Sequence, residues 1–174
     1  MTRTLLHRFI RRQERTLDAP LHYLREIADS SPAAFFKFAL LVPLGTHRRF
    51  LPLEAWHVAR VAATFAEDCG TCAQIALNLA RRDRISPSLL RAVISGNDNA
   101  LPPPLADINR FVRLLLRRHD DPLLRERLVS HFGRNGFIEL GLVIATSRFI
   151  PGLKRALGHA QSCALLRFET SLAA

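Results

Sequence analysis

The clearest chemistry in this chain is Cys69-Gly70-Thr71-Cys72, a C-x-x-C stretch that uses two of its three cysteines. Residues 73–82 follow without Gly or Pro and have strong helix propensity. The pair is therefore expected at the first turn of a helix, where partial positive charge and unpaired N–H groups favour a thiolate. Because the thiolate is the form of cysteine that does redox chemistry, the pattern predicts a dithiol/disulfide centre.

Two other roles are open for the cysteine pair. A C-x-x-C can be half of a zinc site, but no second cysteine pair completes one, and His57 would add only a third ligand. Two buried cysteines can also act merely as small apolar residues. At 100° per residue, both sulfurs lie toward the apolar face of the helix, with Cys72 one turn deeper than Cys69.

The preceding segment, 53–66, is expected to form a helix that carries a polar stripe toward the cysteines. The stripe consists of Glu54, His57, Arg60, Thr64 and Glu67. His57 could be a general base that deprotonates a thiol, and Glu54, one turn earlier, could orient it. A solvated polar face is the alternative; it is preferred for Arg60 and Glu67 and stays open for His57.

Three further residues carry expectations of their own. Asp68 is expected to cap the helix that follows it, because Asp is favoured at N-caps. Glu139 lies in the apolar stretch 137–150 and so requires a buried partner, for which Arg148 is a candidate. The third cysteine, Cys163, is expected to be a structural residue.

The chain is predicted to be all-α, because apolar residues recur at spacings of three and four. A single domain spans residues 1–174, with no convincing internal boundary. We expect a basic loop over 43–52, a connector over 97–104 and an interruption at Pro151-Gly152. The predicted helices cover 4–17, 18–28, 33–41, 53–66, 69–82, 86–96, 105–119, 121–133, 136–149 and 154–166.

The composition is that of a globular protein, with 48% hydrophobic and 23% charged residues. The net charge of +10 comes mostly from Arg scattered in short pairs without interleaved aromatics, so nucleic acid is an unlikely partner. The basic start, 1–17, predicts an amphipathic helix rather than a targeting peptide. We expect no membrane span, and the few cysteines indicate a reducing, cytoplasmic setting.

The run Glu-Asp-Cys-Gly-Thr-Cys-Ala-Gln over 67–74 resembles the alkylhydroperoxidase D (AhpD)-like branch of the carboxymuconolactone decarboxylase superfamily. The apolar stretch 137–149 and the Pro-Gly-Leu-Lys-Arg-Ala-Leu-Gly run after it support the resemblance. It covers residues 35–163 and leaves 1–34 as an added N-terminal helical extension. It implies a helical bundle that assembles as trimers or hexamers of trimers.

The resemblance also implies a thiol-dependent peroxidase or disulfide oxidoreductase that needs no metal or organic cofactor. Cys72 would attack a hydroperoxide or disulfide substrate, Cys69 would resolve the sulfenate to a disulfide, and an external dithiol would reduce it. The family's peroxidase pattern has a Glu twelve residues before the first cysteine and a His four after the second. Here His57 and Ala76 stand at those positions, so His57 would have to replace the missing base.

The loss of that histidine keeps a second hypothesis open. The chain could be a non-catalytic helical oligomerisation or interaction module that has lost the proton relay. Its basic N-terminal helix would then bind an acidic partner or a membrane surface.

Overall fold

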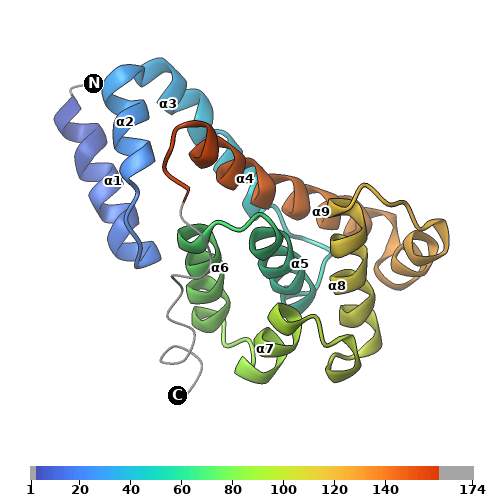
Figure 1. Ribbon diagram of the computed structural model, residues 1–174. Helices are drawn as coiled ribbons and strands as arrows, with labels where there is room; N and C mark the ends of the chain where they lie inside the picture. Colours follow the sequence, from blue (N-terminus) through green and yellow to red (C-terminus); the bar gives the residue numbers. More distant parts are fainter. Residues whose placement is uncertain (1–2, 161–174) are drawn as a thin grey trace.

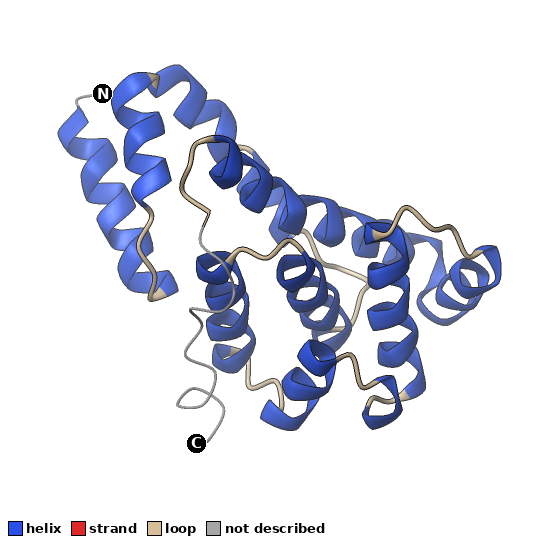
Figure 2. Ribbon diagram, viewed as in Figure 1, coloured by secondary structure: helices blue, strands red, loops and turns tan. Residues whose placement is uncertain are grey.

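Helices account for all regular secondary structure in the computed structural model, which describes residues 3–160 (Figure 2). Within these residues the predicted all-α class is confirmed. The α-helices are α1 (Arg3–Leu17), α2 (His22–Ser30), α3 (Pro32–Ala39), α4 (Leu41–Thr46), α5 (Leu53–Ala66), α6 (Gly70–Arg82), α7 (Pro87–Ser95), α8 (Pro103–Leu116) and α9 (Pro122–Ala156), and a 3-10 turn, η1, covers Asp98–Ala100.

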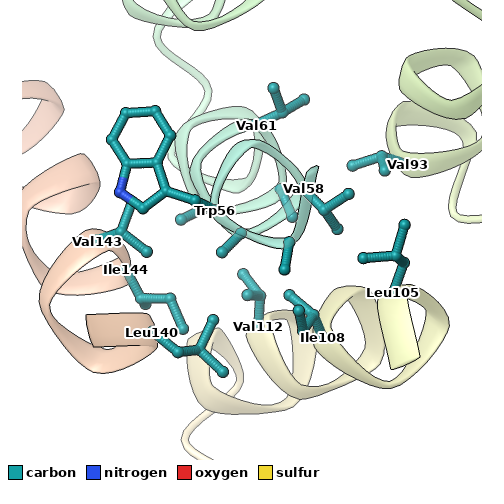
Figure 3. Close-up of a cluster of buried hydrophobic side chains, with 14 of the residues drawn as sticks. Trp56, Val58, Val61, Val93, Leu105, Ile108, Val112, Leu140, Val143 and Ile144 are labelled. Carbon is teal, nitrogen blue, oxygen red and sulfur yellow. The ribbon is translucent and has the colours of Figure 1, made fainter. Parts of the chain in front are cut away.

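Helix α5 occupies the centre of the body, and α6, α7, α8 and α9 all pack against it (Figure 1). It can be surrounded because alanines at several of its positions let neighbouring helices approach closely. Figure 3 shows Val58 of α5 facing Ile108 and Val112 of α8, with Leu140 of α9 beside them. Full burial of each such side chain stabilises the fold by about 1.5–3 kcal/mol. This core fixes the helix that carries His57.

Helices α1 to α3 form a second hydrophobic cluster, which reaches Ile75 of α6 and Ile150 of α9. Two hydrogen bonds join the end of α1 to α6. The Asn78 side-chain amide donates to the Leu17 carbonyl at 3.1 Å, and the Arg82 guanidinium donates to the Thr16 carbonyl at 2.8 Å. The N-terminal helices therefore lie beside α6, the helix whose first turn contains the cysteine pair (Figure 1).

The structure corrects two predicted boundaries. Part of the expected loop 43–52 is helical, because α4 packs on α9 where Gly45 meets Thr146. A Cβ at Gly45 would lie 3.0 Å from the Thr146 hydroxyl, so any larger residue would require the Thr146 side chain to shift. The expected interruption at Pro151 is also wrong. Pro151 is buried within α9, and packing of this last segment outweighs the missing N–H.

Helix α9 bends at Gly133, whose φ of 69° and ψ of 168° are non-helical. The predicted end of a helix at this glycine is therefore confirmed as a bend. By length and composition alone, α9 is the one helix among the described residues that could cross a membrane. This is a weak indication, because core helices of soluble proteins pass the same test, and Leu128 and Leu140 are buried in the body. The absence of a membrane span stays a prediction.

Candidate dithiol site

The two cysteines lie at the start of α6, after a tight turn from α5. Asp68 adopts a left-handed conformation with φ of 47°, which Asp tolerates better than most residues. Cys69 follows in an extended conformation and is itself the N-cap of α6, so the predicted cap at Asp68 is wrong. The Cys69 and Cys72 sulfurs are 2.9 Å apart and not bonded, against about 2.05 Å in a disulfide.

Both cysteines face the interior, as the helical phase predicted, but their depth is reversed. Cys69 is 0% exposed and Cys72 is 8% exposed, so the expectation that Cys72 is the deeper residue is wrong. The N-cap position explains this, because Cys69 sits in the turn that α9 covers, while Cys72 borders an open cavity. Of the two thiols, Cys72 is therefore the one that lines the cavity.

A lysine from the far end of the chain lies beside Cys69. Lys154 of α9 is 4% exposed and forms no salt bridge with a carboxylate among residues 3–160. The pKa of the Cys69 thiol is lowered to about 6, mainly by the hydrogen bond with the Cys72 thiol. Burial opposes this shift, while the Cys72 backbone N–H and then the Lys154 ammonium add to it. A thiolate on Cys69 therefore supplies the counter-charge that a buried lysine requires.

Two arginines on either side of Lys154 hold α9 in place. Arg148 donates to the Glu67 carboxylate at 2.7 Å, and Arg155 also bonds Glu67, which ends α5. Glu67 is thus a docking point for α9 rather than part of a solvated face. The Lys154 ammonium also lies 5.7 Å from the centre of the Tyr23 ring. Burial, followed by the charges of both cysteines, raises the pKa of Tyr23, so its phenol stays protonated.

His57 is fully buried on α5, with its Nε2 2.7 Å from the Asp83 carboxylate. Because an ionised carboxylate can only accept, Nε2–H is the donor and Nδ1 carries a lone pair. That Nδ1 has no hydrogen-bond partner within the described part of the chain. Burial lowers the pKa of His57 more than Asp83 raises it, so the ring is neutral at pH 7. Glu54 is exposed, so the carboxylate that orients His57 is Asp83 instead.

A cavity of about 690 Å³ joins these groups. The N-terminal helices form one wall, and α5, α6 and α9 form the other. Its lining is mainly apolar and includes Cys72, His57 and Lys154. The structure therefore brings Cys72 and His57 to one cavity from two helices, while Glu54 is not part of its lining.

Glu139 has a structural role. Its carboxylate accepts hydrogen bonds from the backbone N–H groups of Arg49, Phe50 and Leu51 at 2.8–2.9 Å. Burial alone would raise the pKa of Glu139, but these donors outweigh it and lower the pKa. The proposed partner Arg148 is wrong, since it binds Glu67. Glu139 instead closes the loop before α5. The expectation for Cys163 lies outside the described residues.

Sequence reasoning missed Lys154 and Asp83. Lys154 is one of only two lysines in a chain whose cations are otherwise Arg, a faint signal for a distinct role. Asp83 lies after the end of α6, 26 residues from His57, and no local pattern joins the two. Within residues 3–160, no three His, Cys, Asp or Glu side chains gather as metal ligands would.

Comparisons with protein-family models, with curated proteins and with solved structures find no match.

Proposed function

We propose that the chain is a thiol-dependent peroxidase or disulfide oxidoreductase, similar in its cysteine chemistry to AhpD-like proteins. One observation carries the proposal: two reduced sulfurs lie 2.9 Å apart at a helix N-terminus, beside a buried lysine. A pair of inert core cysteines would require no buried cation, and burial of Lys154 without an anion would be strongly unfavourable. The arrangement therefore favours a working thiolate.

The reaction begins from a Cys69 thiolate hydrogen-bonded to the Cys72 thiol. Transfer of the Cys72 proton to Cys69 gives a Cys72 thiolate at the cavity wall. This thiolate attacks the hydroperoxide: an S–O bond forms, the O–O bond breaks, and the leaving alkoxide takes the proton from Cys69. The Cys69 thiolate then attacks the Cys72 sulfenic acid, which forms the disulfide and releases hydroxide that is protonated to water. An external dithiol restores both thiols by exchange.

His57 lies on the same wall of the cavity as Cys72 and is the proposed base in molecules whose Cys69 is already protonated and cannot take the Cys72 proton. Its ring is neutral at pH 7, and Asp83 holds the Nε2 proton, which leaves the Nδ1 lone pair to accept one. In this role His57 replaces the histidine that the family pattern places at Ala76. The site residues proposed for catalysis are Cys72, Cys69 and His57, with Asp83 in place of Glu54 as the positioning residue.

Single-turnover assays with a hydroperoxide test the two cysteine roles. Cys72→Ser should abolish hydroperoxide consumption, because Cys69 does not border the cavity. Cys69→Ser should consume one equivalent and leave a sulfenic acid on Cys72 that dimedone traps. Wild-type protein that is inert both to hydroperoxides and to lipoamide-type dithiols would refute the proposal. We also propose a homo-oligomer, a trimer or hexamer, and a cytoplasmic setting.

A surface feature favours a second candidate function, that of an interaction module at an anionic membrane. Helix α1 exposes Arg8 and Arg12 on one face, and Leu5 and Phe9, each 47% exposed, lie alongside them. A helix that exposes basic side chains next to apolar ones is typical of helices that lie on the surface of an acidic membrane. Anionic vesicles should co-sediment the wild-type chain but not the Arg8→Glu/Arg12→Glu variant. Equal sedimentation of both would exclude this function.

A further inference from the structure

The cavity beside the cysteine pair has the dimensions and walls of a small-molecule site. Its volume of about 690 Å³ falls inside the range of about 300–1,000 Å³ usual for ligand pockets. Phe9, Phe35 and Phe38 of the N-terminal helices line it, and Ile150 of α9 does as well. Rings and aliphatic chains of this kind bind an extended apolar group.

One cation in this lining forms no salt bridge within the described residues. The Arg60 guanidinium stacks over the Trp56 ring, 4.9 Å from its centre. Burial lowers the pKa of Arg60 to about 10, and the charge of the Asp83 carboxylate opposes this shift without forming an ion pair with the guanidinium. The other charged lining residues are engaged, since Asp83 binds His57 and Lys154 lies against Cys69. Arg60 therefore provides a planar, partly desolvated donor set inside an apolar cavity.

The complement of such a cavity is an amphipathic anion. A guanidinium binds a carboxylate through two parallel N–H···O bonds, which gives both strength and orientation. We propose that the cavity binds a long-chain carboxylate, with its carboxylate on Arg60 and its alkyl chain among the phenylalanines of α1 and α3.

This ligand class would explain why a redox thiol borders the same cavity. A hydroperoxide carried on the alkyl chain of such an acid would be delivered to Cys72. That substrate assignment rests on the proposed function, whereas binding of the carboxylate does not.

Trp56 makes the test direct, because it is the only tryptophan in the chain and it lines the cavity. Its fluorescence is followed while wild-type protein is titrated with dodecanoate, and separately with dodecanol, below the concentrations at which either self-associates. We expect saturable binding of both, with dodecanoate tighter. Arg60→Gln should weaken dodecanoate binding by about 10- to 100-fold, since a hydrogen bond to a charged group contributes about 1.5–3 kcal/mol. Its affinity for dodecanol should be unchanged.

Arg134→Gln is the matched control, because Arg134 is exposed on α9 and outside the cavity. It should bind dodecanoate like the wild type. Arg60→Lys provides a second variant, in which the charge remains but the two-bond geometry is lost, and its affinity should be intermediate. Equal affinity of wild-type protein for dodecanoate and dodecanol, or no binding of either, would overturn the proposal. Because the readout is equilibrium binding, the result is independent of redox turnover.

Discussion

Lys154→Met removes the charge beside Cys69 while keeping a side chain of similar length. The pKa of Cys69 in the wild type is about 6, so roughly 90% of this residue is thiolate at pH 7. An adjacent opposite charge typically shifts a pKa by about 1–3 units, and here the Cys72 hydrogen bond is the larger cause. We therefore expect the substitution to raise the pKa of Cys69 by about 1–2 units.

The measurable consequence is a smaller thiolate population at neutral pH. A rise of that size leaves about 50% to 10% thiolate at pH 7, and so lowers the thiolate absorbance of Cys69 about two- to ten-fold. At pH 10 Cys69 is ionised in both proteins, which should then absorb alike.

Absorbance at 240 nm, where a thiolate absorbs and a thiol does not, is followed across pH 4–10 and gives the pKa without a reagent having to reach the buried Cys69. Lys154→Arg keeps the charge and serves as the control, which should retain a midpoint close to the wild type. Circular dichroism establishes that each variant is folded. If the titration midpoint of Cys69 is the same in Lys154→Met as in the wild type, Lys154 does not stabilise the Cys69 thiolate. The thiolate would then not be the counter-charge of the buried lysine.

Two further predictions concern the carboxylates of Glu139 and Asp83. Glu139→Gln should lower the free energy of unfolding by about 1.5–3 kcal/mol at pH 7, measured by urea denaturation, because an amide cannot accept all three backbone donors. Folding lowers the pKa of Glu139, so the carboxylate contributes its full stabilisation above about pH 4.5. This stabilisation is lost as the pH falls through the pKa of Glu139 in the folded state. The free energies of unfolding of the wild type and the variant should therefore converge in acid. Asp83→Asn should lower the pKa of His57 further, because the carboxylate raises it against the effect of burial. NMR titration of the imidazole measures this, and a higher pKa would contradict the assigned contact.

The features predicted correctly from the sequence are those set by residues close together in the chain. The helical phase placed Cys69 and Cys72 on the buried side of α6, and the structure confirms this. The glycine at 133 predicted a helix end, and α9 bends there. Glycine there adopts a positive φ that other residues rarely reach, so the signal is local. The error at Pro151 has the opposite origin, because its ring is accommodated by packing between helices distant in sequence.

The contacts that decide the chemistry could not be predicted, because they join distant segments. Lys154 approaches Cys69 across 85 residues, and nothing in either stretch indicates the other. The sequence leaves both a base role and a solvated position open for His57, and its partner follows the next helix rather than lying one turn away. The polar stripe on α5 predicts a solvated Arg60. In the fold, the N-terminal helices close that side of the body and turn it into a cavity wall.

Cys69 and Cys72 are proposed to form a reversible redox pair. The decisive experiment equilibrates wild-type protein in dithiothreitol buffers of graded potential and then applies acid quenching and peptide mapping. We expect a single two-electron transition between a dithiol and an intramolecular Cys69–Cys72 disulfide, fully reversed by excess reductant. If both cysteines remain reduced and unlinked in the most oxidising buffer, the proposed redox pair is wrong.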